Sequence, residues 1–407
     1  MTHEESLIET LAISLALAFA FGLLAARLRL PPLVGYLLAG IVLGPHTPGW
    51  VVDVRLAPQL ADIGVMLLMF SVGTHFTLRE LAAVKAVAVP GALAQIVFST
   101  ALGAWVAHLW GWSGGAGLVF GLALSVASTV VLLRALQQRG ALASDDGRIA
   151  VGWLVMEDLV TVVVLVLLPA VAGLLGGETP AAAQHASLWA MLARVLGKVA
   201  LFVALMLLVG ARAFPWILAR VARTNSRELF TLAAIALALG VAYGAAKMFG
   251  VSVALGAFFA GMVISGSAHS QRAAGYLQPL QDIFTALFFV AVGMLFEPLV
   301  LIQHPLQVLA VLAIIILAKS FAAALLVLLL RRPLRTALTV AVALAQIGEF
   351  SFILAVTGVE LQVLPELGES YIVAGALLSI ALNPLWFALL ARTRAAAPAS
   401  QPTVSDT

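Results

Sequence analysis

The chain has 407 residues, of which 63% are hydrophobic and 10% are charged, and its formal net charge at pH 7 is +3. Soluble domains carry about 45–50% apolar and about 25% charged residues, so this composition excludes a soluble enzyme, a DNA-binding protein and a disordered chain. A membrane helix takes roughly 20 apolar residues, so the chain can supply about a dozen spans. It contains no cysteine, which excludes disulfides and thiolate metal sites.

Apolar stretches bounded by charged residues, Pro and Gly predict thirteen membrane helices, since open strands cannot satisfy their backbone groups in lipid. In chain order they cover residues 7–28, 32–47, 57–77, 86–110, 115–137, 148–174, 188–214, 228–247, 251–267, 275–296, 305–330, 335–358 and 368–391. Of the 22 Lys and Arg, seventeen fall in loops on one side, two in loops on the other and three inside helices. Because cytoplasmic loops are enriched in Lys and Arg, we expect a multi-pass protein of the cell (inner) membrane with its N-terminus outside and its C-terminus in the cytoplasm.

Two halves of the sequence resemble each other at an offset of about 220 residues. Residues 60–73 align with 280–293, which places Asp62 on Asp282, and residues 35–40 and 256–261 both read Gly-x-x-x-Ala-Gly. The offset corresponds to seven helices, an odd number, so the halves cross the membrane in opposite senses. Helices 1–6 and 8–13 therefore form a predicted inverted repeat, which is typical of secondary transporters. For the repeated Asp pair we favour a role as a helix cap or gate.

Four ionisable residues are predicted at mid-membrane depth, where charge is costly and usually functional. Glu157 and Asp158 are adjacent in one helix, and Lys319 and Glu349 lie centrally in two others. Neighbouring residues on a helix point in different directions, so one acid can pair with Lys319 while the other faces a wet cavity. The free acid could hold either a proton or a monovalent cation. A purely structural ion-pair cluster is the alternative, and for Glu349 a bond to broken-helix backbone is as well supported as ion contact.

Polar residues and glycine interrupt two helices at corresponding places of the repeat. The interruptions are Ser125 to Thr129 and Gln346 to Phe350. Interrupted helices at matching positions mark transporter binding sites, because their free backbone ends can face an ion. Ser128, Thr129, Gln346 and Glu349 are therefore predicted contacts where the broken helices cross. The alternative is that Ser128 only bonds back to its own helix.

Several motifs together resemble the monovalent cation:proton antiporter-2 family on its Kef-type potassium/proton side. They are Val126–Val131, Trp153–Leu159, Gly250–Gly261, Leu287–Gly293, Lys319 and Gln346–Phe350, within about residues 7–391. The resemblance implies an all-α, sodium/proton-antiporter-like fold with two crossing broken helices. It also implies that Asp158 binds ion and proton, and that Lys319 pairs with Glu157. The family is usually homodimeric, with one helix group as scaffold and the other as moving core.

Two departures from the family pattern matter. Glutathione-gated members have an acidic stretch before the tenth helix, whereas residues 268–275 here contain no carboxylate, so that gating is not expected. Many relatives continue into a nucleotide-binding Rossmann domain, whereas residues 396–407 here look like a linker-like cytoplasmic tail behind a transmembrane domain at 1–395. No cofactor is expected in this chain, and a nucleotide would bind only to such an additional domain.

The sequence thus predicts a proton-coupled antiporter for monovalent cations, K⁺ more than Na⁺, that works by alternating access. Helices 3–6 and 10–13 are the expected moving core. A Na⁺/H⁺ antiporter of the same fold and a cation channel of similar ancestry are the alternatives. The seven His residues have no metal-ligand spacing, so the expected metals are only the transported ions, and no enzyme is expected. Expected partners are H⁺, membrane lipid and a second copy of the chain, and no nucleic acid.

Overall fold

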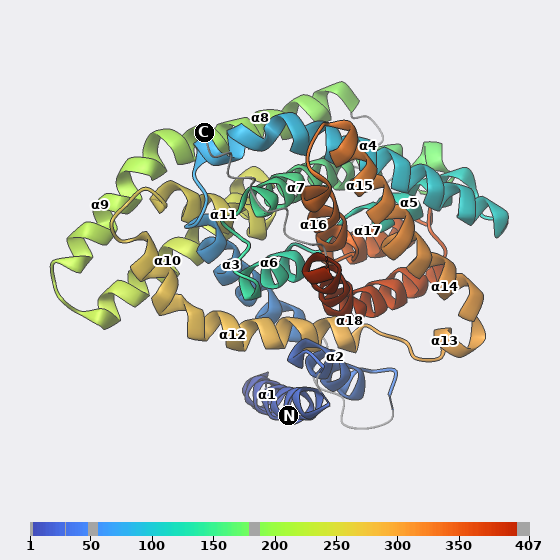
Figure 1. Ribbon diagram of the computed structural model, residues 1–407, viewed down its shortest axis with the longest axis horizontal. Helices are drawn as coiled ribbons and strands as arrows, with labels where there is room; N and C mark the ends of the chain where they lie inside the picture. Colours follow the sequence, from blue (N-terminus) through green and yellow to red (C-terminus); the bar gives the residue numbers. More distant parts are fainter. Residues whose placement is uncertain (1–2, 29, 48–55, 179–187, 397–407) are drawn as a thin grey trace, which may run out of the picture.

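A computed structural model describes residues 3–28, 30–47, 56–178 and 188–396, and within these ranges all regular structure is helical (Figure 1). The predicted all-α fold is confirmed, and the predicted tail lies almost entirely outside the described residues. The helices are α1 (His3–Arg27), α2 (Pro32–Leu43), α3 (Leu56–Gly73), α4 (Leu78–Leu109), α5 (Gly114–Ser125), α6 (Thr129–Gln138), α7 (Asp145–Val171), α8 (Leu188–Leu205), α9 (Ala211–Ala222), α10 (Arg227–Gly244), α11 (Val253–Ile264), α12 (Ser270–Met294), α13 (Val300–Gln303), α14 (Pro305–Ala313), α15 (Lys319–Leu329), α16 (Leu334–Leu344), α17 (Glu349–Glu360) and α18 (Glu366–Ala396). Short 3₁₀ or π segments continue some of them, namely η1 (Ala172–Leu175), η2 (Met206–Gly210), η3 (Ala245–Phe249) and η4 (Ile314–Ala318).

Each predicted span coincides with one helix or one pair of helices. In the described part of the chain, 9 helical segments are long and apolar enough to cross a membrane, or 10 if the bent pair α16 and α17 counts as one span. Three shorter apolar helices, Pro32–Leu43, Gln59–Gly73 and Val253–Ile264, occupy the remaining predicted positions. The number thirteen stays a prediction, because these three fall short of the usual length of a span.

The helices form two groups (Figure 1). Helix group 1 comprises α1–α3 and α9–α12, in which α3 packs mainly on α11 and α12. Helix group 2 comprises α4–α7 and α14–α18, in which α4 packs on α5 and α7, and α15 packs on α16. The expected moving core, helices 3–6 and 10–13, is divided between the two groups, since α3 and α12, the predicted helices 3 and 10, pack in helix group 1.

Glycines explain why α3 and α12 belong there. A Cβ on Gly40 of α2 would lie 2.8 Å from the Cα of Gly293 in α12, and a Cβ on Gly261 of α11 would lie 3.0 Å from the Cα of Gly73 in α3. At these distances a Cβ atom would collide with the backbone of the neighbouring helix, so only glycine fits at Gly40 and Gly261. The repeat aligns Gly40 with Gly261 and Gly73 with Gly293, so the two contacts are copies of each other. The sequence repeat is thus also a repeat of packing.

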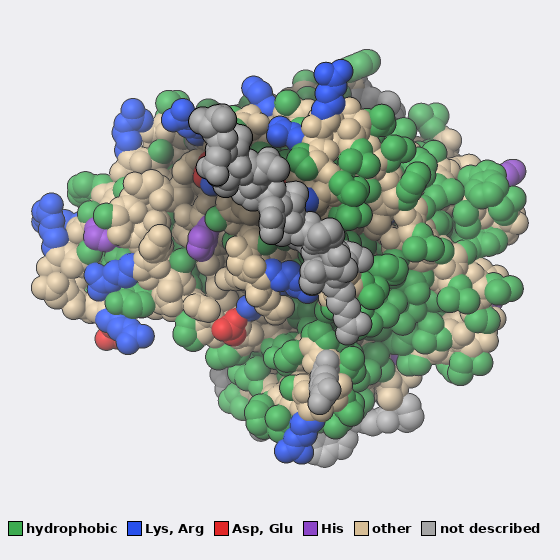
Figure 2. Space-filling model, viewed as in Figure 1, with side chains coloured by type: hydrophobic (Ala, Val, Ile, Leu, Met, Phe, Trp, Pro, Cys, Tyr) green, Lys and Arg blue, Asp and Glu red, His purple; other side chains and the backbone are tan. Residues whose placement is uncertain are grey.

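The outer surface suits a lipid environment. Large apolar side chains such as Phe19, Trp189 and Leu208 are exposed, and hydrophobic side chains cover a broad part of the face drawn in Figure 2. Lys and Arg side chains gather toward the end of this face where α9 meets α10. An apolar surface of this extent would aggregate in water, whereas lipid tails cover it without cost.

Candidate ion-binding site

Two helix breaks form the centre of helix group 2. Helix α5 ends at Ser125 and α6 starts at Thr129, with Ser128 as the N-cap whose hydroxyl accepts a 3.3 Å hydrogen bond from the Val131 amide. Helix α16 ends at Leu344 and α17 starts at Glu349, and the two helices are bent by 47°. Ser128 therefore does bond back to its own helix, as the alternative interpretation expected, and it has further bonds besides.

The two breaks cross in direct contact. The Ser128 amide donates to Gln346 Oε1 at 2.7 Å, and Gln346 Nε2 donates to the Ser128 carbonyl oxygen at 3.1 Å. A Cβ on Gly348 would lie 2.5 Å from the Cα of Ser128, so glycine is required for this approach. One fully buried amide side chain thus satisfies both backbone groups of Ser128. The structure brings these predicted crossing residues together.

Glu157 of α7 binds the first break. Its Oε2 accepts a 2.8 Å hydrogen bond from the Ala127 amide, and its side chain is fully buried. This amide lies just ahead of α6, where the positive end of the helix dipole favours an anion. Glu157 Oε1 is buried and has no hydrogen-bond partner in the described part of the chain.

Lys319, the first residue of α15, binds the second break. Its Nζ donates to the Gln346 carbonyl oxygen at 3.3 Å, just beyond the negative end of α16. The expected direct ion pair with Glu157 is not formed in this arrangement, because no ion pair within 4.0 Å joins the two side chains, both of which lie in the described ranges. Each charge instead neutralises a helix end of opposite sign.

Asp158 points away from this network, toward helix group 1. Thr129 Oγ1 lies 3.3 Å and 3.4 Å from its two carboxylate oxygens, which makes a long and weak hydrogen bond. With Met69 of α3 and Phe258 of α11, Asp158 lines a void of about 10 Å³. That volume is close to the least that can hold one water molecule. The structure therefore shows an acid with available oxygens in an almost closed space.

The other predicted acids lie outside this contact network. Glu349 occupies the first turn of α17, and among the described residues no hydrogen bond or ion pair joins it to Asp158 or Lys319. Asp62 is exposed on α3. Asp282 of α12 forms a 2.8 Å ion pair with Arg134 of α6, which the sequence did not indicate.

Sequence reasoning missed Gln95 of α4. This fully buried side chain donates through Nε2 to the Ser125 carbonyl oxygen at 3.1 Å, and its Oε1 accepts a 3.3 Å hydrogen bond from Trp153 Nε1. It thereby satisfies the last carbonyl of α5. A single amide in the middle of an apolar span was the signal that could have identified it, because a buried polar group needs partners.

Comparisons with known proteins agree with this geometry. Residues 13–393 match the family described as "Sodium/hydrogen exchanger, transmembrane". The chain is 58% identical over 391 residues to "Putative cation/proton antiporter YbaL" of Escherichia coli (strain K12), covering 96% of this chain and 69% of that protein. It is 33% identical over 386 residues to K(+) efflux antiporter 4 of Arabidopsis thaliana, covering 94% of this chain and 64% of that protein. These relatives confirm the resemblance to the Kef-type side of the cation:proton antiporters.

A solved structure shares the fold. The sodium proton antiporter MjNhaP1 of Methanocaldococcus jannaschii superposes with a TM-score of 0.71 at 17% identity, covering 97% of this chain and 100% of that chain. The predicted sodium/proton-antiporter-like architecture is thereby confirmed.

Proposed function

The chain belongs to the transmembrane sodium/hydrogen exchanger family, whose members are antiporters and not enzymes, and on that premise we propose that it exchanges K⁺, in preference to Na⁺, for protons. Asp158 is the carrier in this proposal. A carboxylate can hold a proton or coordinate a monovalent cation, and the two compete for the same oxygens. That competition couples the two fluxes in opposite directions.

The single observation that carries the proposal is the contrast between the two adjacent acids. Glu157 is committed to the Ala127 amide at 2.8 Å, whereas Asp158 has only the 3.3–3.4 Å contact from Thr129. A group that must bind and release an ion in every cycle cannot be tied up by strong bonds. Glu157 and Lys319 then hold the broken helices in place, and Asp158 remains free to react.

Alternating access follows from where Asp158 lies. It belongs to helix group 2 but faces Met69 and Phe258 of helix group 1, so a displacement of one group against the other would open the closed void to one side. We propose helix group 2 as the moving part and helix group 1 as the scaffold, with a second copy of the chain as partner. Near-closure at Asp158 speaks against a channel, which needs a continuous wet path.

The preference for K⁺ rests on the relatives. Proteins named K(+) efflux antiporters are about one third identical to this chain over nearly its whole length, whereas the sodium proton antiporter of known structure is 17% identical. A Na⁺/H⁺ antiporter of the same architecture is the second candidate, since the Asp158 oxygens suit either ion.

Ion exchange in proteoliposomes with an internal pH dye tests the proposal. An outward K⁺ gradient should drive H⁺ inward, Na⁺ should drive it less, and Asp158→Asn should reduce exchange at least tenfold. Asp145→Asn is the matched control, because Asp145 lies on the same helix with a side chain that is 93% exposed. Near-normal exchange by folded Asp158→Asn would contradict the assignment, and K⁺ flux without H⁺ movement would favour a channel.

A further inference from the structure

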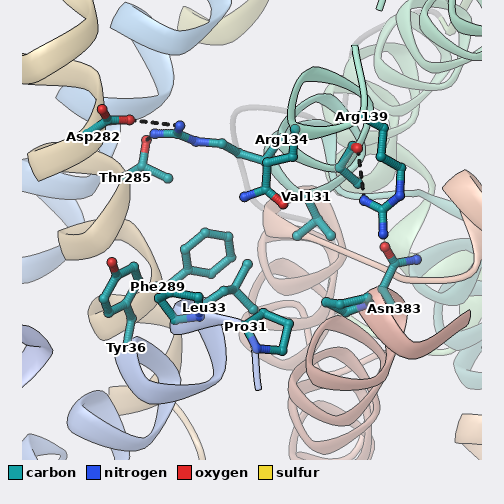
Figure 3. Close-up of a pocket in the computed structure, with 14 residues that line it drawn as sticks. Pro31, Leu33, Tyr36, Val131, Arg134, Arg139, Asp282, Thr285, Phe289 and Asn383 are labelled. Atoms are coloured by element: carbon teal, nitrogen blue, oxygen red, sulfur yellow. Dashed lines mark hydrogen bonds and ion pairs between the residues drawn. The ribbon is translucent and has the colours of Figure 1, made fainter. Parts of the chain in front are cut away.

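Arg134 joins the two helix groups. From α6 its Nη1 lies 2.8 Å from Asp282 Oδ1, and its Nη2 donates to Thr285 Oγ1 at 2.9 Å and to the Gln281 carbonyl oxygen at 3.4 Å. All three partners are on α12, and Figure 3 shows two of them, Asp282 and Thr285. The guanidinium therefore binds three acceptors within about one turn of the neighbouring helix.

The other ion pairs seen between described residues do not connect the groups. The remaining pairs, Arg148 with Glu80 or Asp145 and Arg335 with Asp146, stay inside helix group 2. The Arg134 side chain is 19% exposed and that of Asp282 is 54% exposed, so the pair is partly shielded from water. A displacement of α6 along α12 by a few ångströms would break all three contacts.

The pair lines a cavity of about 720 Å³ between the groups. Its walls come from α2 and α12 on one side and from α6 and α18 on the other (Figure 3). The position of Arg134 near the end of α6 places the cavity on the side that the Lys and Arg distribution predicts to be cytoplasmic. The Arg134 contacts and this cavity therefore occur together in the same conformation of the protein.

The internal repeat supplies no equivalent charge pair for the opposite arrangement. Asp282 corresponds to Asp62 and Arg134 to Leu354. In an inverted-repeat transporter the two halves exchange their conformations between the two states, so in the opposite state Asp62 would approach the position of Leu354. Leucine offers no charge to it. The ion pair therefore stabilises one state and has no counterpart in the other.

We propose that Arg134, Asp282 and Thr285 form an asymmetric clasp that biases this protein toward the state with the 720 Å³ cavity. Arg134 and Asp282 act as positioning residues and touch neither ion nor proton. The role of the clasp in exchange rests on the proposed function, whereas its effect on the helix arrangement does not.

Because the chain contains no cysteine, two cysteines can report the arrangement directly. Gln138→Cys on α6 and Gln278→Cys on α12 are both exposed positions, and spin labels there give an inter-group distance distribution by pulsed electron resonance. The parent should populate mainly the distance of the arrangement described here. Arg134→Gln or Asp282→Asn should raise the ratio of the alternative distance population to this one about threefold to tenfold, as expected for losing a partly shielded, charged hydrogen bond. The swap Arg134→Asp with Asp282→Arg should restore the original distribution.

Arg139→Gln is the matched control, since Arg139 lines the same cavity but contacts the Ala135 carbonyl oxygen and the Phe387 ring within helix group 2. Its distance distribution should equal that of the parent. An unchanged distribution in Arg134→Gln would overturn the proposal, and so would a swap that fails to restore it. If Arg134→Gln does not fold, Thr285→Val must give a smaller shift in the same direction. If Arg134→Gln shifts the distances while the parent shows no H⁺ exchange, the proposed function is refuted and the clasp is supported.

Discussion

Both helix groups pack some helices through glycine, as Gly103 on Gly121 does in helix group 2, but helix group 2 also contains the two crossing helix breaks. In helix group 1, α2 meets α12 and α3 meets α11 through glycine backbones, with no side chain between them. In helix group 2, the breaks are held by Gln346, Glu157 and Lys319, whose polar atoms bind free backbone groups. Close backbone packing allows little relative movement, whereas polar side chains at the breaks satisfy the free backbone groups and leave the nearby Asp158 available for chemistry. Helix group 1 therefore suits a rigid scaffold and helix group 2 contains the polar site, and both groups take helices from each half of the internal repeat.

The largest effect should come from the glycine contacts. Gly293→Leu would drive a side chain into α2, and because backbone cannot move aside we expect a loss of at least about 3 kcal/mol, enough to prevent folding. Expression and thermal unfolding in detergent measure it. Gly240→Ala is the control, because a Cβ there meets nothing within 4 Å, and its stability should rise slightly or stay unchanged. Equal behaviour of both variants would mean that the backbone contact does not define helix group 1.

Next in size are the buried charges. Glu157→Gln and Lys319→Gln should each cost about 3 kcal/mol, since each removal leaves an opposite charge buried. Without direct contact, we expect the double variant to recover only about 0.5–1 kcal/mol of the summed loss. A double-mutant cycle on melting temperatures provides the test. Strict additivity would show that the two charges act only on their own helix ends, and complete recovery would indicate a direct pair in another state.

A smaller effect is expected at the crossing itself. Gln346→Leu leaves the Ser128 amide without its partner and the Ser128 carbonyl with only the Leu132 amide, which should cost about 1–3 kcal/mol and lower exchange because the two breaks separate. Exposed Gln278→Leu is the control and should leave both properties unchanged. If stability falls while exchange keeps its rate, the crossing has a structural role only.

The smallest effect concerns pH at Glu80, which precedes the membrane part of α4. A hydrogen bond from the Thr77 amide, together with the Thr77 hydroxyl and Arg148, lowers the pKa of Glu80 below its usual 4.5 despite some burial. Because the pKa of Glu80 is lower in the folded than in the unfolded protein, its ionised form stabilises the fold at pH values above the unfolded pKa. This stabilisation is lost as the pH falls through the folded pKa. We expect ~0.3 kcal/mol after screening, seen as a shallower acid destabilisation in Glu80→Gln below about pH 4.5. The same acid slope in both proteins would exclude Glu80 as its source.

Some features of this protein follow from sequence because they depend on composition or local chemistry. Apolar length predicted the spans, and the Gly-x-x-x-Ala-Gly segments revealed a repeat whose glycines do make equivalent contacts. Polar interruptions at Ser128 and Gln346 marked the crossing, because backbone groups freed inside a membrane need partners. Gln95 gave the same kind of signal but was overlooked.

Other features depend on how the helices rotate and pack, and tertiary structure alone decided them. Sequence placed Glu157, Asp158 and Lys319 at similar depth, but only packing separated Glu157 from Lys319 and turned Asp158 toward helix group 1. It likewise assigned α3 and α12 to that group and brought Arg134 to Asp282, 148 residues later in the chain. Depth in the membrane follows from counting residues along one helix, whereas contact requires the relative rotation and offset of two helices, which all their packed side chains set together.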